Sequence, residues 1–328
     1  MPERPKVIYL GSDAICLPGL ETLVERCASQ CELVGIVSQP DRRQGRGKKL
    51  QANPVATFAR ERVIPLLQPE KPDADLVEWI RSEGVALAFV MAYGHFLPKA
   101  LREAPIHGIV NFHGSLLPAY RGASPVETAI AEGETETGVC LMRIVKEMDA
   151  GGVADCEKLA IGPDETSPEV RARLGEAVRP LIARNLKPLL SGESVFVEQV
   201  RSEATFCRRI TKEDGAIDFS LAGGVICNRF RAFNPWPGAF FEHGLQPIRV
   251  GEMTCISSDR DSRQAPGTVV SAGHSLEVAV GDGLLSLGQL QRPGGRMLPA
   301  QEFLRGYPIG VGELLGGRKA VPLVRKEP

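Results

Sequence analysis

Two polar residues, Asn111 and His113, stand one residue apart where an apolar run at residues 108–110 ends. In an extended segment alternate side chains share a face, so the amide and the imidazole are expected to point the same way. Hydrogen-bond donors aimed together suit a reacting carbonyl oxygen, and an imidazole titrates near neutrality. Taken alone, such a pair is also typical of turn chemistry around a core histidine.

A carboxylate, Asp149, ends a second strand-like stretch at residues 138–149, and Gly151 and Gly152 follow it. The two glycines are expected to let the backbone turn tightly. Acyl transfer to an amine passes through a tetrahedral adduct whose oxygen carries negative charge. Asn111 and His113 could stabilise that oxygen, and losing one such donor typically costs about 10²–10³ in rate. Asp149 could accept the proton that the attacking ammonium must lose. This chemistry requires no metal, so we predict no metal site.

The elements before this site predict a parallel sheet. Residues 7–12 and 32–37 read as buried strands, and between them Leu17, Leu20 and Leu23 lie at helical spacing. Such a β-α-β opening indicates an α/β fold with a Rossmann-like, doubly wound, mostly parallel sheet. Ligands bind such sheets beyond the carboxyl ends of the strands. No Gly-x-Gly-x-x-Gly motif is present, which disfavours a dinucleotide site.

The rest of the chain divides into two parts with different patterns. Further strands are predicted at residues 64–67, 85–92, 108–113 and 155–161, and helices at 53–60, 75–83, 100–104, 124–130 and 168–190. From about residue 207 short β-type runs alternate with Pro- and Gly-rich turns, which predicts an all-β, OB-like barrel. We therefore expect a catalytic domain at residues 1–190, a linker at 191–206 and a second domain at 207–328. Trp236, in a Pro-rich turn, is expected to anchor the barrel core.

Composition indicates a globular protein without a membrane partner. The chain has 328 residues, of which 43% are hydrophobic and 24% charged, and its net charge is -1. Its start resembles neither a signal peptide nor a membrane span, so we expect a cytoplasmic location. We also expect a monomer. The eight cysteines form no Cys-x-x-Cys pair, and we expect them to be buried thiols rather than disulfides or metal ligands.

A basic segment follows the second predicted strand. Residues 42–49 contain five Lys or Arg residues spaced by glycines. Such a run is often only a solvated charged loop. Its position at the carboxyl end of a strand instead suits a phosphate backbone. Residues 207–328 also carry 15 Lys and Arg against 12 Asp and Glu, a small basic excess.

The segments around Asn111 to Pro118 and Asp149 to Gly152 resemble the signature of the formyltransferases that use 10-formyltetrahydrofolate. In that family the equivalents of Asn111, His113 and Asp149 form the catalytic trio. The resemblance spans about residues 7–306. Motifs at residues 39–50, 120–125 and 231–239 are similar to those of the family members that formylate methionine on initiator tRNA, for translation initiation.

This resemblance implies roles for further residues. The folate site would be formed by Ser115, Leu116, Leu117, Pro118, His95, Phe96, Leu97 and Val145. The tRNA contacts would come from Arg42, Arg46, Lys48, Lys49, Arg208, Arg209 and Lys212, with Arg46 the most important side chain. The barrel would grip the acceptor arm. Cys140 and Arg143 depart from the family pattern, which puts details of the folate pocket in doubt.

Several alternatives remain at this stage. A family member acting on a sugar-nucleotide amine would share the trio, but a small amine offers no backbone for the basic segment to clasp. The purine-pathway enzyme that formylates glycinamide ribonucleotide lacks such a second domain. A formyltetrahydrofolate hydrolase or dehydrogenase module would not need the basic segment. A catalytically inactive tRNA- or folate-binding module is disfavoured by the complete trio.

Overall fold

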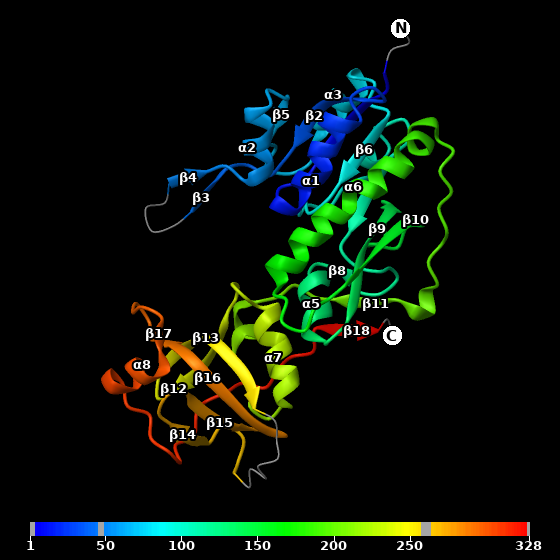
Figure 1. The fold of residues 1–328 in the computed structure, drawn as a ribbon. Helices are drawn as coiled ribbons and strands as arrows, with labels where there is room; N and C mark the ends of the chain where they lie inside the picture. The colour runs from blue at the N-terminus through cyan, green and yellow to red at the C-terminus, as the bar shows by residue number, and fades with distance from the viewer. Residues whose placement is uncertain (1–3, 45–48, 257–263, 327–328) are drawn as a thin grey trace.

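The computed structural model describes residues 4–44, 49–256 and 264–326, which form two lobes (Figure 1). Arg46 and Lys48, both predicted to contact tRNA, lie outside the described residues. Hydrophobic cores form separately in the two lobes. Ile210, Phe233 and Leu323 come from the C-terminal part of the chain but belong to a core of the first lobe, so the lobes share an apolar joint.

The first lobe is built on a seven-stranded sheet in the order β10-β9-β7-β6-β1-β2-β5. Its strands are β1 Lys6–Leu10, β2 Glu32–Val37, β5 Leu66–Leu67, β6 Leu87–Val90, β7 Ile109–His113, β9 Glu136–Arg143 and β10 Val153–Ala160. The five strands from β5 to β7 are parallel, whereas β9 and β10 run antiparallel at one edge. The predicted doubly wound, mostly parallel sheet is confirmed.

Helices cover both faces of this sheet, as the alternation along β1 requires. Val7 and Tyr9 pack into one core and Ile8 and Leu10 into the other. The first face is covered by α1 Leu17–Glu21, α2 Pro54–Glu61, α5 Pro125–Ala131 and α6 Ser167–Ser191, and the second by α3 Ala74–Ser82 and α4 Lys99–Arg102. Burial on both faces explains the continuous apolar runs in the sequence. None of the described helices is long and apolar enough to cross a membrane.

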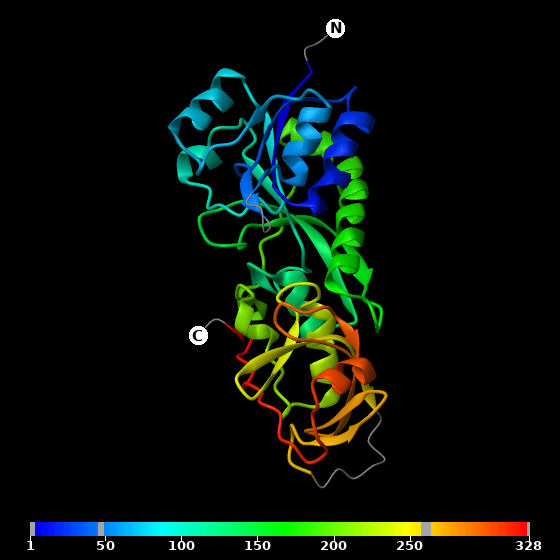
Figure 2. The same cartoon turned by 90° about the vertical axis from the view of Figure 1, so that its left-hand side faces the viewer.

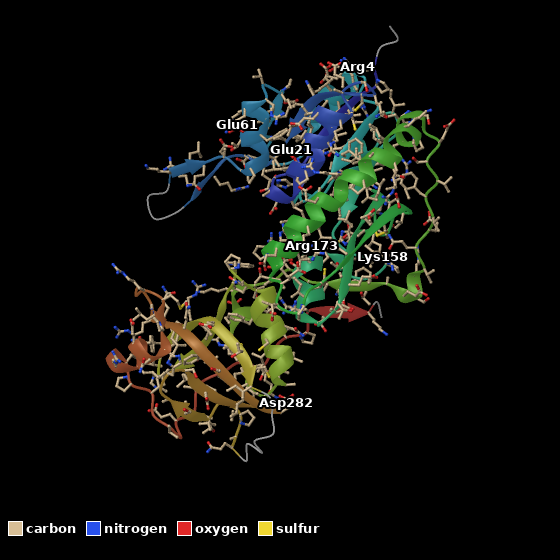
Figure 3. The ribbon with its side chains drawn as sticks, viewed as in Figure 1. Arg4, Glu21, Glu61, Lys158, Arg173 and Asp282 are labelled. Carbon is tan, nitrogen blue, oxygen red and sulfur yellow. A yellow bond between two sulfur atoms is a disulfide. The ribbon has the colours of Figure 1, made fainter. Side chains whose placement is uncertain are left out.

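Local sequence signals fix where the longer helices begin and end. The Asn53 side chain accepts a hydrogen bond from the Ala56 N–H, and Pro54 then opens α2. A capping box between Thr166 and Glu169 starts α6, and Gly192, with φ 75°, ends it. Two arginines of α6 form ion pairs: the guanidinium of Arg173, labelled in Figure 3, contacts Glu165 at 2.6 Å, and that of Arg179 contacts Glu21 at 2.6 Å.

The second lobe contains an antiparallel sheet in the order β12-β13-β16-β15-β14. Its strands are β12 Ala239–His243, β13 Gln246–Ile256, β14 Val269–Ala272, β15 Leu276–Val280 and β16 Gly283–Gln291, with β17 Leu298–Pro299 beside β16. A later segment bridges both edges of the sheet, because Gly316 pairs with Glu242 and Leu314 with Thr268. This pairing draws β12 and the start of β14 together, which supports the predicted barrel-like arrangement.

Two expectations for this lobe need correction. The lobe is not purely β, because α7 Gly223–Ala232 and α8 Ala300–Gly306 pack on the sheet. Both helices are short and lie between turn-rich segments, so their apolar patterns did not indicate helices in the sequence. Trp236 is not a core anchor, since 58% of its surface is exposed. The neighbouring Phe233 is buried, but it packs into the core of the first lobe rather than that of the barrel.

A small three-stranded sheet joins the two lobes. It consists of β8 Arg121–Gly122, β11 Thr205–Cys207 and β18 Val324–Lys326, in the order β18-β11-β8. The predicted linker packs against the first lobe and runs beside β10 (Figure 1). Val197 and Val153 exchange two backbone hydrogen bonds in an antiparallel bridge. The end of the chain returns to the first lobe through β18.

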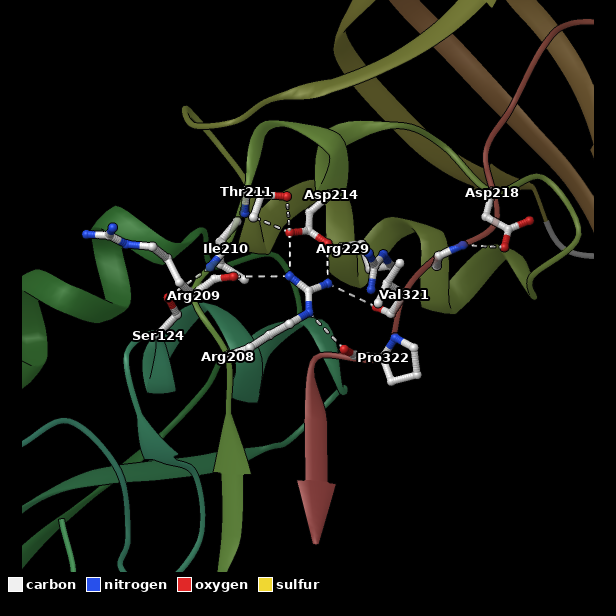
Figure 4. Close-up of polar contacts among 11 residues, drawn as sticks. Ser124, Arg208, Arg209, Ile210, Thr211, Asp214, Asp218, Arg229, Val321 and Pro322 are labelled. Carbon is white, nitrogen blue, oxygen red and sulfur yellow. Dashed lines mark hydrogen bonds and ion pairs between the residues drawn. The ribbon is translucent and has the colours of Figure 1, made fainter. Parts of the chain in front are cut away.

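Arg208, directly after β11, is half-buried and contacts both Asp214 and the C-terminal segment (Figure 4). Its guanidinium donates to both carboxylate oxygens of Asp214 and to the carbonyl oxygens of Arg209, Val321 and Pro322. These contacts occupy the side chain that was expected to bind tRNA. Sequence alone could not show this, because the acceptors come from the distant C-terminal segment.

Cys140 and Cys156 form a disulfide, contrary to the expectation of free thiols. They lie directly opposite each other on β9 and β10. The pairing depends on strand register, which a sequence separation of 16 does not reveal. Among the other six cysteines, Cys16, Cys27, Cys31 and Cys207 are buried as expected, whereas Cys227 is half-buried and Cys255 exposed.

The joint predicts a pH-dependent contribution to stability. Burial raises the pKa of Asp214. Hydrogen bonds from Arg208 and Thr211, together with the Arg208 charge, lower this pKa by more than burial raises it, so it lies below the ordinary value. A carboxyl group with a lowered pKa stabilises the fold above its unfolded pKa, near 4, and this contribution is lost as pH falls through the folded pKa.

We therefore expect Asp214→Asn to lower the free energy of unfolding by about 2 kcal/mol at pH 7. Urea titrations at pH 7 and at acidic pH should show the difference from wild type shrinking in acid. Glu78→Gln, on the exposed side of α3, serves as the control. An equal difference at both pH values would contradict this role of the carboxylate.

Candidate active site

Asn111 and His113 lie near the carboxyl end of β7, between β6 and β9. Asn111 is opposite Val90 on one side and Met142 on the other, and His113 is opposite Cys140. Between them Phe112 points to the other face, where its ring stacks on Phe89 at 5.9 Å. The predicted alternation is thus present, with the two polar side chains on one face of the strand.

His113 is buried, and each of its ring nitrogens faces an oxygen atom. Its Nε2 lies 3.1 Å from the Tyr120 carbonyl oxygen, and its Nδ1 lies 3.8 Å from Asp149 Oδ2. A carbonyl oxygen only accepts, so Nε2 carries the hydrogen in this arrangement. The Nδ1–carboxylate separation exceeds a hydrogen bond. A proton could therefore pass between the two groups through water or after a small approach.

Asp149 lies in the loop between β9 and β10, because β9 ends at Arg143 rather than at the aspartate. Its backbone has φ 50°, a left-handed conformation that a residue with a Cβ rarely adopts. The carboxylate accepts a 2.8 Å hydrogen bond from the Gly122 N–H, and the side chain is 20% exposed. Asp149 thus faces both His113 and solvent.

The two glycines after Asp149 permit close packing rather than the expected tight turn. A Cβ on Gly151 would lie 1.9 Å from the Arg143 carbonyl oxygen, and one on Gly152 would lie 2.9 Å from the Phe196 Cβ. The loop closes where the Arg143 N–H donates to the Gly152 carbonyl oxygen at 2.9 Å. Any larger residue at position 151 would push the loop, and Asp149 with it, away from the sheet.

Asn111 offers a free amide beside this pair. Its side chain is half-buried and makes no hydrogen bond to another residue in the described parts of the chain. It lies on the same face of β7 as His113. An acyl oxygen placed there could accept from the amide, which is the arrangement that transition-state stabilisation needs.

The residues expected at the folate site lie on three segments. Ser115 is buried and donates to the Ala119 carbonyl oxygen at 2.6 Å, which shapes the turn after β7. Leu117 and Pro118 line an open hollow of about 260 Å³ together with β10 and residues 197–200. Leu116 packs over Gly138, and Val145 is half-buried in the loop after β9.

The third segment, residues 95–97, follows β6. The Nε2 atom of His95 is buried and has no hydrogen-bond partner in the described structure, although the ring lies against Tyr93 with centroids 5.2 Å apart. Phe96 is 70% exposed, whereas Leu97 is buried. A buried polar atom without a partner, beside an exposed aromatic ring, is suited to a planar ligand with polar edges.

The basic segment forms a hairpin of β3 Arg42–Gln44 and β4 Lys49–Gln51. Arg42 and Lys49 are exposed. A network anchors its base, because Arg60 and Gln68 each donate to Asp41 at 2.8 Å. Hydrogen bonding from Gln68 and the Arg60 charge hold the pKa of Asp41 below its ordinary value despite some desolvation. The hairpin and the second lobe project on the same side of the molecule (Figures 1 and 2).

Arg209 and Lys212 differ from Arg208 in the joint. Both are exposed, and Figure 4 shows the Arg209 side chain directed away from the Arg208–Asp214 cluster. These two cations therefore remain available to a ligand. Among the described residues, no group of three or more His, Cys, Asp or Glu side chains is arranged to hold a metal ion.

Three residues around the trio were not predicted from the sequence. The Tyr120 carbonyl and Gly122 N–H hold His113 and Asp149, and the Gln199 amide donates to the Asp149 carbonyl oxygen at 2.8 Å. The first two act through the backbone, so their side-chain types carried no signal. Gln199 lies in a weakly patterned segment that gave no reason to single it out.

Family models match both lobes of the chain. The model of the formyl transferase family matches residues 6–186, and the model of the formyl transferase C-terminal domain matches residues 209–308. A methionyl-tRNA formyltransferase from Sorangium cellulosum is 38% identical over 313 residues, which cover 95% of this chain and 99% of that protein. A methionyl-tRNA formyltransferase from Sulfurihydrogenibium sp. is 34% identical and covers 94% of this chain and 99% of its own length.

Solved structures share the fold at low sequence identity. An N-formyltransferase from Helicobacter canadensis, in complex with folinic acid and dTDP-3-aminofucose, has a TM-score of 0.66 at 16% identity and covers 88% of this chain and 99% of its own. HypX from Aquifex aeolicus, with tetrahydrofolic acid, has a TM-score of 0.61 at 14% identity and covers 93% of this chain and 48% of its own. The family models match most of both lobes, and this chain belongs to the formyl transferase family.

Proposed function

We propose that this protein transfers the formyl group of 10-formyltetrahydrofolate to the free amino group of methionine on initiator tRNA. The observation that carries the proposal is the convergence of Asn111, His113 and Asp149 at one end of β7, with His113 Nδ1 3.8 Å from the carboxylate. The full-length similarity to methionyl-tRNA formyltransferases supports the substrate. The reaction serves translation initiation, and we place it in the cytoplasm with the protein acting as a monomer.

Asn111 and His113 stabilise charge in this reaction. The amine nitrogen attacks the formyl carbon, and the carbonyl electron pair moves onto the oxygen. The free Asn111 amide donates to that oxygen, and the imidazole donates after exchanging its Tyr120 contact for the substrate. The bond from the formyl carbon to the folate nitrogen then breaks, and the carbonyl re-forms.

Asp149 transfers a proton from the attacking nitrogen to the leaving group. It accepts a proton from the attacking nitrogen, directly or through water, because it is partly exposed and faces His113. The proton then passes to the departing folate nitrogen. The Gly122 N–H keeps the carboxylate oriented, and no covalent bond to the protein forms.

For the folate we propose the segments that flank the trio. The unpartnered Nε2 atom of His95 and the exposed Phe96 ring fit the polar edge and the flat face of a pterin. Leu97 and Val145 supply apolar contacts, and residues 115–118 form the turn that closes the site beside His113.

For the tRNA we propose the hairpin and the second lobe. Arg42 and Lys49 on the hairpin, with Arg209 and Lys212 near the joint, are exposed cations suited to phosphates. Arg46 and Lys48 belong to the same basic segment. We assign catalysis to residues 1–190, the docked linker to 191–206 and tRNA binding to 207–328.

A sugar-nucleotide amine is the second candidate acceptor. The solved structure from Helicobacter canadensis holds such a compound, but at 16% identity it supports only the fold. The basic hairpin and the relatives at 34–38% identity favour tRNA.

The first prediction concerns the oxyanion donors. Asn111→Ala and His113→Ala should each lower kcat about 10²–10³-fold, because each removes one donor from the developing oxyanion. Formyl-methionyl-tRNA would be quantified with 10-formyltetrahydrofolate as donor and a sugar-nucleotide amine as the alternative acceptor. His274→Ala, an exposed histidine of the second lobe, is the control. Transfer to the sugar amine alone would overturn the proposed substrate.

The second prediction concerns the hairpin. Arg42→Ala and Lys49→Ala should weaken tRNA binding and reduce the dependence of log Kd on log salt by about 0.7–0.9 per lost phosphate contact. Lys158→Ala, on β10 away from the hairpin (Figure 3), is the control. Unchanged salt slopes in both hairpin variants would show that the hairpin does not contact phosphates.

A further inference from the structure

Gln199 in the linker binds the backbone of the loop that carries Asp149. Its Nε2 donates to the Asp149 carbonyl oxygen at 2.8 Å and to the Gly151 carbonyl oxygen at 2.7 Å. Its Oε1 accepts from Arg121 Nε at 3.0 Å and Nη2 at 2.8 Å. Both donors and both lone pairs of the amide are therefore used.

The linker that carries Gln199 is itself firmly docked. Val197 exchanges two backbone hydrogen bonds with Val153 on β10, at 2.8 and 2.9 Å. One residue earlier, the Arg143 guanidinium lies over the Phe196 ring at 4.3 Å. These contacts fix the position of Gln199 relative to the sheet.

Arg121 connects this contact to the small sheet of the joint. It is buried in β8 and lies over the Phe206 ring at 5.8 Å, and Arg325 of β18 lies over the same ring at 5.9 Å. The next residue, Gly122, donates its N–H to the Asp149 carboxylate. Two residues of β8 thus support Asp149. Gly122 contacts its carboxylate directly, and Arg121 contacts Gln199, which in turn binds the Asp149 backbone.

Asp149 needs such support because its backbone is left-handed, with φ 50°. A residue with a Cβ adopts that conformation at a cost, although aspartate does so more readily than most, and contacts with its surroundings stabilise it. Without Gln199, two carbonyl oxygens of the loop would lose their donors, and the loop could relax toward an ordinary conformation. The carboxylate would then move away from His113.

We propose that Gln199 is a positioning residue that sets the Asp149 carboxylate against His113. This inference rests on the proposed role of Asp149 in formyl transfer. It assigns the linker a part in the reaction, because the segment leading to the second lobe also holds the catalytic loop.

The test compares two substitutions of Gln199. Gln199→Leu removes all four hydrogen bonds, whereas Gln199→Glu keeps an acceptor for Arg121 and replaces the donor to the loop with a carboxylate oxygen. Both should lower kcat about 10–100-fold, because small displacements of a catalytic group are costly, and leave both KM values within about twofold. Ser202→Ala, exposed in the same linker, should match wild type.

A double-mutant cycle distinguishes an effect of Gln199 that acts through Asp149 from a loss of activity that is independent of Asp149. In an Asp149→Asn background, Gln199→Glu should lower kcat less than about twofold, because its effect acts through the carboxylate. An equal loss in both backgrounds, or kcat within twofold of wild type for both Gln199 variants, would overturn the inference.

Hydrogen exchange gives a readout that does not depend on the reaction. Gln199→Glu should speed exchange of the Gly122 amide, whose acceptor is Asp149, relative to Ser202→Ala. If the wild-type protein forms no formyl-methionyl-tRNA, the proposed function fails, and exchange alone decides the positioning. Unchanged exchange at Gly122 would then refute it.

Discussion

The site depends on one backbone conformation, the left-handed turn at Asp149. Only this turn brings a carboxylate from the β9–β10 loop to within 3.8 Å of an imidazole on β7. The conformation is unfavourable by itself, so the surrounding contacts must impose it. Gly151 allows the loop to lie against the Arg143 backbone, and the Gly122 N–H holds the side chain.

Those contacts come from segments that are far apart in the chain. β8, β11 and β18 form one small sheet, so the residue that holds the carboxylate is linked to the last described strand. The Arg208–Asp214 cluster binds the same C-terminal segment at Val321 and Pro322. The two lobes are therefore connected through a sheet that also contacts the Asp149 loop.

The sequence predicted much of this arrangement because strong patterns are local. Continuous apolar runs marked β1, β2 and β6, and the alternation around Phe112 correctly placed Asn111 and His113 on one face. The helices predicted at residues 53–60 and 168–190 correspond to α2 and α6. Long-range contacts were not predictable in this way. The Cys140–Cys156 disulfide depends on strand register. The contacts of Arg208 with Pro322 and of Gln199 with Asp149 join segments that are distant in the sequence.

The most direct test is the rate of a single turnover of formyl transfer to methionyl-tRNA by Asp149→Asn compared with wild type. Asparagine keeps the shape and can still accept from Gly122, but it cannot take a proton. We expect the transfer rate to fall at least about 100-fold, with binding of folate and tRNA unchanged. A rate within a few-fold of wild type would show that the carboxylate does not accept the proton, and would contradict the catalytic role of Asp149.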